Sequence, residues 1–177
     1  MTRNNYVIGI HAGHAVVGSR GAKDKLDEVI ENRKIKKYCI ERLESKGFSV
    51  VDCTVHSGTQ KSVLNNILKK SKKYKTDLNV SLHLNAGGGN GVEVYAPSYD
   101  KLDKACNASH YIWSKCGFKH RGGKKAPLFV TNHLKNCYLY EIGFVDSEKD
   151  YELYKKNGEK KIGYVVADSI IKYLMEV

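Results

Sequence analysis

Three side chains in this sequence have the types and positions that could together hold a catalytic metal ion. His14 lies in the turn-like segment HAGH, and His83 ends the apolar segment LNVSLH. Glu28 lies in the first turns of a long helical pattern. Two imidazoles and one carboxylate leave a fourth tetrahedral position open, as in hydrolytic zinc sites. We therefore interpret these residues as candidate ligands of Zn²⁺, which would lower the pKa of a water molecule to about 7.

Each candidate ligand also has a structural interpretation. A histidine at a strand end is commonly a hydrogen-bonded structural residue, and Glu28 could complement the helix dipole. His11 competes with His14, and spacing alone does not choose two histidines from seven, since no HExxH motif occurs. We expect most of the other histidines to be solvated in polar loops or on helix faces: His56, His110, His120 and His133.

Two carboxylates lie in apolar surroundings. On a helical wheel Glu28 shares the apolar face with Asn32, Ile35, Cys39 and Leu43, where a carboxylate is costly unless it is paired or binds a metal. Glu141 interrupts the apolar strand pattern YLYEIGF. It could form an ion pair with one of the many lysines, or it could act as a general base.

The elements that must position these residues alternate between strand and helix. Apolar runs predict strands at 6–10, 48–53, 78–83, 92–96, 128–130 and 138–142. Helical patterns cover 26–46, 61–74 and 101–116, and a closing amphipathic helix follows from Ile162, Val166, Ile170 and Leu174. A GGGNG turn occupies 87–91. This order predicts a single α/β domain with a mostly parallel sheet, whose site lies beyond the carboxyl ends of the strands.

Five segments, in order and spanning nearly the whole chain, resemble motifs of the zinc-dependent N-acetylmuramoyl-L-alanine amidases of autolysins, sporulation enzymes and phage endolysins. The segments are IGIHAGH with RGA a few residues on, DEVIENRK, SLHLNAG, NGVEVYAPS and YEIGFVDSEKDYELY. The family usually has Asp-Pro where this chain has His11-Ala12, so His11 could tune or compete at the metal site. It also has a proline ahead of the last glutamate strand, where this chain has Asn136-Cys137.

The resemblance implies a role for each matched residue. His14, Glu28 and His83 would be the zinc ligands, and Asn32 would accompany Glu28. Glu141 would shuttle a proton from water to the departing amine, and the final motif also contains the downstream Asp150.

The implied reaction is hydrolysis of the amide bond between N-acetylmuramic acid and L-alanine in peptidoglycan, with zinc polarising the carbonyl. The implied fold is a three-layer α/β domain with a mixed, mostly parallel sheet of about six strands flanked by helices. We expect residues 1–177 to form this catalytic domain without a separate wall-binding domain.

The charge balance indicates partners rather than fold. Lys and Arg number 30 against 19 Asp and Glu, a formal net charge of +11. Such a surface attracts nucleic acid, anionic membrane or anionic wall polymers, or it serves solubility alone.

A basic nucleic-acid-binding module is one rival hypothesis, supported by twelve tyrosines that could stack on bases. No helix-turn-helix, zinc-finger or RNP signature occurs, so we expect peptidoglycan and wall polymers as partners instead. A wall-binding protein with a degenerate site is the other rival, although the four key residues are present.

The cysteine content and the N-terminal sequence indicate the compartment in which the chain is synthesised. Five cysteines without a CxxC pair favour synthesis under reducing conditions. The apolar run near the N-terminus is too short for a signal peptide, and no stretch is long enough to span a bilayer. We therefore expect synthesis in the cytoplasm and action on the wall after phage lysis or non-standard export. The basic surface would bind the cell wall, unless a wall-binding domain has been removed from this chain. The sequence indicates no oligomeric state.

Overall fold

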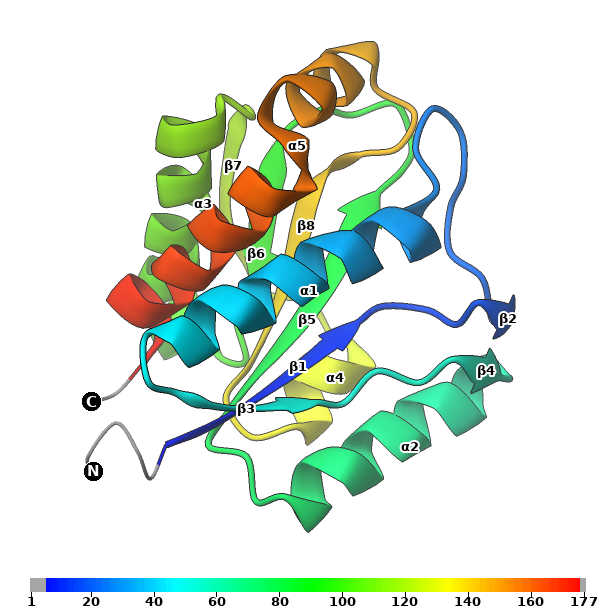
Figure 1. Ribbon diagram of the computed structural model, residues 1–177, viewed down its shortest axis with the longest axis vertical. Coiled ribbons are helices and arrows are strands. Elements are labelled where there is room, and N and C mark those ends of the chain that lie inside the picture. The colour runs from blue at the N-terminus through cyan, green and yellow to red at the C-terminus, as the bar shows by residue number, and fades with distance from the viewer. Residues whose placement is uncertain (1–5, 176–177) are drawn as a thin grey trace.

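A six-stranded sheet organises residues 6–175, the part of the chain that the computed structural model describes (Figure 1). The strand order is β3 (Ser49–Asp52), β1 (Val7–Ala12), β5 (Leu78–Asn85), β8 (Cys137–Phe144), β6 (Val92–Tyr95) and β7 (His120–Lys124). The first four strands are parallel, β6 is antiparallel to β8, and β7 is parallel to β6. A separate parallel pair joins β2 (Val17–Gly18) and β4 (Ser57–Gly58). The expected α/β fold with a mixed, mostly parallel sheet is confirmed.

Helices cover both faces of the sheet. On one face α1 (Glu28–Ser45), α3 (Leu102–Cys116) and α5 (Glu148–Ser169) contribute to the larger apolar core. On the other face α2 (Gln60–Lys73) and the short α4 (Phe129–His133) build a smaller core. The turn η2 (Tyr99–Lys101) precedes α3, and the π-helical turn η3 (Ile170–Leu174) follows α5. Figure 1 shows α1 and α5 crossing in front of the sheet, with α2 on its other side. Among residues 6–175, no helix combines the length and the apolar character that a membrane crossing requires.

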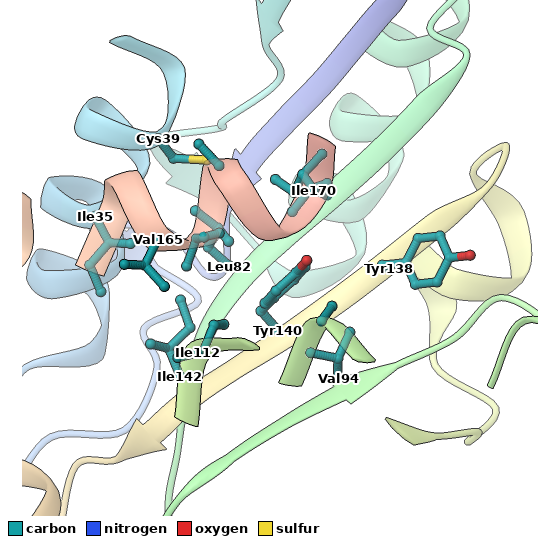
Figure 2. Close-up of a cluster of buried hydrophobic side chains, with 14 of the residues drawn as sticks. Ile35, Cys39, Leu82, Val94, Ile112, Tyr138, Tyr140, Ile142, Val165 and Ile170 are labelled. Atoms are coloured by element: carbon teal, nitrogen blue, oxygen red, sulfur yellow. The ribbon is translucent and has the colours of Figure 1, made fainter. Parts of the chain in front are cut away.

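The two faces of the sheet differ in chemistry, because successive strand side chains point to opposite faces. Even-numbered residues of β1, β5, β6 and β8 enter the larger core, except Ala12 and Phe144 at the strand ends, and Figure 2 shows Leu82, Val94, Tyr140 and Ile142 among them. The strand register brings odd-numbered polar residues together on the opposite face. Ser81 lies beside His11, and Glu141 lies between His83 and Glu93: His11↔Ser81, His83↔Glu141 and Glu93↔Glu141 are the paired positions.

The start of α1 is fixed by local signals. The Asp27 side chain accepts a hydrogen bond from the backbone N–H of Ile30 at 3.4 Å, as an N-cap residue does. The helix ends before Gly47, whose φ of +83° suits glycine. Because Glu28 is the first residue of this helix, the cap places its carboxylate near the carboxyl ends of β1 and β5.

One expected strand is wrong, and one observed strand of the six-stranded sheet was not expected. Residues 128–130 do not form a strand: Leu128 precedes α4, and Val130 packs into the smaller core from that helix. A run of three apolar residues fits a buried helical turn as well as a strand. The sixth strand is instead β7, whose sequence HRGGK carries no strand pattern.

The closing helix also begins earlier than its apolar repeat. α5 starts at Glu148, where the Ser147 hydroxyl accepts from the N–H of Asp150 at 3.2 Å. It is kinked at Gly158, whose φ is +71°.

Candidate metal centre and active site

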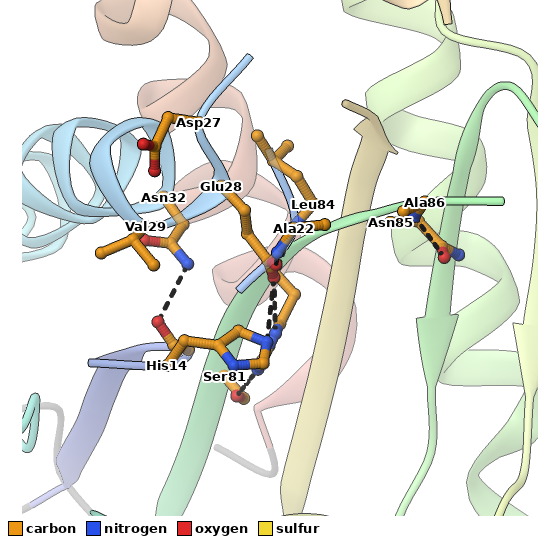
Figure 3. Close-up of polar contacts among 12 residues, drawn as sticks. His14, Ala22, Asp27, Glu28, Val29, Asn32, Ser81, Leu84, Asn85 and Ala86 are labelled. Atoms are coloured by element: carbon orange, nitrogen blue, oxygen red, sulfur yellow. Dashed lines mark hydrogen bonds and ion pairs between the residues drawn. The ribbon is translucent and has the colours of Figure 1, made fainter. Parts of the chain in front are cut away.

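Three side chains converge at the carboxyl ends of β1 and β5, and Figure 3 labels two of them, His14 and Glu28. His14 follows β1, Glu28 begins α1 and His83 lies within β5. Glu28 Oε1 lies 3.4 Å from His14 Nε2 and 2.9 Å from His83 Nδ1. One ligand atom from each of the three residues lies within 4.8 Å of the others. The three residues that the sequence analysis proposed as ligands are therefore neighbours in space.

Glu28 is an ionised, well-anchored carboxylate. Its side chain is buried, Oε2 accepts from the N–H of Ala22 at 2.9 Å, and Oε1 accepts from the N–H of Leu84 at 3.3 Å. Burial alone would raise its pKa, but the hydrogen bond from His83 and the charges of His83 and His14 outweigh burial and lower the pKa. For His83, burial lowers the pKa, while the hydrogen bond to Glu28 and the charges of Glu141 and Glu28 raise it overall. His83 and Glu28 share a proton in this hydrogen bond, and a metal ion held by the same atoms would displace it.

Glycines in the two loops make room for this cluster. A Cβ on Gly13 would lie 2.0 Å from His83 Cε1, and one on Gly21 would lie 2.2 Å from Glu28 Oε2. The HAGH and RGA segments therefore need glycine for close approach to the cluster. His14 itself has a φ of +58°, in the left-handed region that few residues other than glycine adopt.

Asn32 and Arg33 hold the turn that carries His14. Asn32 Nδ2 donates to the carbonyl of Gly13 at 3.2 Å, and Arg33 Nη2 donates to the carbonyl of His14 at 2.9 Å. Asn32 is buried one helical turn after Glu28 (Figure 3). The companion of Glu28 in the DEVIENRK motif thus contacts the backbone beside the histidine.

Glu141 lies next to this cluster on the neighbouring strand β8. It is paired in register with His83 of β5 and with Glu93 of β6. Its Oε2 is buried and has no hydrogen-bond partner among the described residues. Burial raises the pKa of Glu141 to about 7; the charge of His83 opposes this rise, and the charges of Glu28 and Glu93 reinforce it. Such a carboxyl group can gain and lose a proton near neutral pH.

Glu93 lies in NGVEVYAPS, one of the segments that resemble the family motifs, but the charged cluster around it was not predicted from the sequence. The buried Glu93 Oε2 accepts from Arg121 Nε and from Lys124 Nζ, both at 2.6 Å. Oε1 accepts from the Tyr95 hydroxyl at 2.9 Å and from Asn85 Nδ2 at 3.2 Å. Burial would raise the pKa of Glu93, but the hydrogen bonds from Lys124, Arg121 and Tyr95 lower it below its usual value. A carboxylate within the strand pattern VEVY, and two basic residues in HRGGK, were the available signals.

Other residues singled out from the sequence lie outside the three-residue cluster. His11 is 1% exposed, and neither ring nitrogen has a hydrogen-bond partner among residues 6–175. Burial, and secondarily the charge of His83, lower its pKa to about 3. Asp150 is buried and accepts from the N–H groups of Gly91 and Phe144 at 2.7 and 2.9 Å. His133 is exposed on α4 and bonds to the carbonyl of Phe129 at 2.8 Å.

A cavity of about 180 Å³ adjoins the cluster on the side of α2 and α4. His11, His14 and His83 form part of its wall. The remaining wall is largely apolar and includes Val63, Ile67, Phe129 and Leu139. A mostly apolar hollow beside a few convergent polar groups is the usual form of a small-molecule site.

A partly buried His–Glu–His cluster with a neighbouring protonatable carboxyl group, on an α/β sheet, is the arrangement of a metal-dependent hydrolase. The model of the N-acetylmuramoyl-L-alanine amidase family (Amidase_3) matches residues 8–172, so the chain belongs to this family of enzymes.

Two proteins of Clostridium perfringens match most of this chain. An uncharacterized 38.4 kDa protein is 27% identical over 93% of this chain, and a protein of strain 13 / Type A is 26% identical over 92%. The matches cover 51% of each relative, so the chain spans about half the length of these two proteins.

Solved structures share the fold. The catalytic domain of the CD27L endolysin targeting Clostridia Difficile has a TM-score of 0.85 at 22% identity, covering 97% of this chain and 100% of that one. The catalytic domain of CwlV, an amidase of Bacillus (Paenibacillus) polymyxa var. colistinus, has a TM-score of 0.82 at 23% identity, covering 96% and 98%. Cwp6 from Clostridium difficile has a TM-score of 0.82 at 26% identity, covering 96% of this chain and 29% of that protein. At these identities the first two structures establish the fold alone.

Proposed function

We propose that this chain hydrolyses the amide bond between N-acetylmuramic acid and the L-alanine of the stem peptide in bacterial peptidoglycan, with Zn²⁺ as cofactor. Membership of the amidase family supports the reaction class. The observation that carries the proposal is the buried, unpartnered Oε2 of Glu141 on the strand beside the His14, Glu28 and His83 cluster. A protein that only binds the wall has no need for such a costly group.

The residues of the cluster fit a zinc ion. Their donors are two imidazoles and one carboxylate, which Zn²⁺ accepts, and the carboxylate is ionised in its buried position. Zn²⁺ bound there would polarise the substrate carbonyl and lower the pKa of water to about 7. The hydrogen bonds from the N–H groups of Ala22 and Leu84 to Glu28 would orient this ligand.

Glu141 serves in this proposal as the general base and then the general acid. Its carboxylate accepts a proton from the attacking water, and its carboxylic acid returns the proton to the departing amine of L-alanine. A bound divalent cation would favour the carboxylate form and bring its pKa below that of the metal-free site. Pairing with Arg121 and Lys124 keeps Glu93 ionised, so Glu93 does not compete for this proton.

The proposed domain assignment and the proposed place of action are consistent with a peptidoglycan substrate. We assign the whole chain to the catalytic domain, of which residues 8–172 match the family model, and we place its action at the cell wall. The structures that share its fold include an endolysin domain and bacterial amidases, so a phage origin stays a prediction.

Digestion of purified peptidoglycan tests this proposal. Mass spectrometry of the products should find glycan strands with a free lactyl carboxyl group and peptides with a free N-terminal L-alanine. A chelator should stop the release, and added Zn²⁺ should restore it. Cleavage at a glycosidic bond, or release unaffected by the chelator, would contradict the assigned bond or the cofactor.

A further inference from the structure

A second group of metal-binding side chains lies at the far edge of the sheet, where α3 covers β7. Cys106 and His110 are one turn apart in α3, so they lie on the same helix face. His120 begins the edge strand β7, which β6 and β8 separate from β5 and the first cluster. The proposed amidase reaction uses none of these three residues.

The hydrogen bonds of His120 fix which nitrogen is free. Ser109 Oγ donates its single hydrogen to the carbonyl of Val92 at 2.9 Å, so it accepts from His120 Nδ1 at 3.0 Å. With its hydrogen on Nδ1, the ring presents the lone pair of Nε2, which lies 3.7 Å from Cys106 Sγ. Metal-binding histidines are commonly oriented in this way by a partner on the other nitrogen. Burial, and secondarily the charge of His110, lower the pKa of His120 and so favour the neutral ring that binds metals.

These separations match those of a shared tetrahedral ion. With bonds of about 2.3 Å to sulfur and 2.0 Å to nitrogen, the two ligand atoms would lie about 3.5 Å apart, and two bound imidazoles would have ring centres about 5.2 Å apart. The rings of His110 and His120 lie 5.4 Å apart at 85°. The pair His14 and His83 of the first cluster has nearly the same arrangement, 5.1 Å at 79°.

One side chain must move to complete the group. The ring of His110 packs against Trp113, with ring centres 4.8 Å apart. His110 is exposed, so turning its ring toward Cys106 and His120 is a surface rotamer change rather than a rearrangement of the core.

We propose that Cys106, His110 and His120 bind a second transition-metal ion, with water as the fourth ligand. One thiolate and two imidazoles select Zn²⁺, Co²⁺ or Cu⁺ over Mg²⁺ and Ca²⁺. The ion would tie α3 to β7, the strand whose Arg121 and Lys124 hold Glu93 beside the active site. This second site contains the sulfur ligand that the His14, Glu28 and His83 site lacks.

Titration of the metal-free protein with Co²⁺ separates the two sites. A thiolate ligand gives a near-ultraviolet charge-transfer band with Co²⁺, whereas an imidazole–carboxylate site does not. We expect two bound Co²⁺ ions per chain, with the band saturating as the thiolate site fills. Cys106→Ser should lose the band and one ion but keep the other. Cys116→Ser, which alters a buried thiol at the end of the same helix, should keep the band.

Alkylation gives a second measurement that does not depend on a variant folding. The other four cysteines are buried, and burial raises their thiol pKa, so iodoacetamide should react first with Cys106 in the native protein. Co²⁺ should slow this reaction several-fold, as mapped by peptide mass spectrometry. A wild-type chain that binds Co²⁺ without the band, a band that survives Cys106→Ser, or an unchanged alkylation rate would overturn the proposal.

Discussion

Glu93 and Glu141 are paired across two strands, yet their surroundings push their pKa values apart. Two cations and two neutral donors surround the carboxylate of Glu93. Glu141 has no such donors at Oε2. Burial, opposed by the charge of His83 and reinforced by the charges of Glu28 and Glu93, raises its pKa to about 7. Neighbouring carboxyl groups with separated pKa values are a common way to divide catalytic and structural roles. The structural carboxylate therefore helps to keep the other one protonatable.

Glu141→Gln should remove turnover while leaving the metal in place. The amide has almost the same shape as the carboxyl group but cannot accept the proton of the attacking water. Because general acid–base groups contribute about 10²–10⁴-fold, we expect a loss of that order in peptide release. Zinc content by elemental analysis and the circular dichroism spectrum should match those of the parent chain.

His83→Ala is the matched control for this change, since it should lose both activity and zinc. If Glu141→Gln kept most of the parent rate, another residue would be the base. His133 would be the next residue to test, although it lies on α4 outside the cluster and bonds to the carbonyl of Phe129.

His14→Ala should abolish zinc binding, whereas His11→Ala should only weaken or retune it. His14 Nε2 lies 3.4 Å from the shared carboxylate oxygen of Glu28, whereas His11 lies outside this cluster and its ring nitrogens have no hydrogen-bond partner among the described residues. Zinc titrations of the two variants by calorimetry compare them directly. The opposite order of effects would show that His11 is the true first ligand.

The residue types at the site could be predicted, but their partners could not. His14, Glu28, His83 and Glu141 are candidates because they lie in segments that match family motifs, and the structure brings them together. The pairing of Glu93 with Arg121 and Lys124 was missed, because β6 and β7 become neighbours only through the sheet order. Similarly, the burial of His11 depends on the register of β1 against β5.

At the scale of elements, Asp150 joins the start of α5 to two other segments. Its carboxylate accepts from the N–H of Phe144 at the end of β8 and of Gly91 before β6. Both bonds are buried, so the two donors have no access to water as an alternative partner. One helix residue thereby fixes the ends of the two strands that carry Glu141 and Glu93.

Asp150→Ala should destabilise the fold strongly. Each buried donor left without a partner costs about 1–3 kcal/mol, so we expect a loss of about 2–6 kcal/mol in the free energy of unfolding. Denaturant unfolding of the metal-free protein measures it. Asp146→Ala is a matched control, because Asp146 accepts from the N–H groups of Gly87 and Gly88 in the same way but through exposed hydrogen bonds. A similar small loss in both variants would show that burial does not matter here.

Element prediction succeeded where periodicity was long or capped. The expected helix at 26–46 corresponds to α1 (Glu28–Ser45), and 61–74 corresponds to α2 (Gln60–Lys73). It failed at 128–130 and at β7, because three apolar residues do not define a period and HRGGK pairs through its backbone. The kink at Gly158 separates the polar start of α5 from its apolar repeat, which explains why only the repeat was recognised.

At the scale of the whole molecule, the net charge of +11 predicts salt-dependent adsorption to the wall. Lysis of whole cells should fall steeply with added salt, because exposed charges are screened beyond about 10 Å at 0.1 M salt. Cleavage of a small soluble muramyl peptide should stay nearly constant over the same range. Both assays should use one protein preparation at one pH, with turbidity and product release as readouts.

Each alternative result would assign the charge a different role. Equal salt sensitivity on both substrates would place the effect at the active site, where Arg121 and Lys124 are partly exposed. Insensitivity on both would make the lysines and arginines a solubilising surface.

The alternation of the central strands has a consequence for how this domain tolerates mutation. Even-numbered positions of β1, β5, β6 and β8 face a sealed apolar core, while His11, Ser81, His83, Glu93 and Glu141 are on the other face. A complete substitution scan of these strands, scored separately for folded protein and for activity, should therefore show a period of two. The positions in the larger core would limit abundance, and the polar positions of the intervening set would limit catalysis. Within this family, new specificities could then arise by changes at alternate residues without a loss of the core.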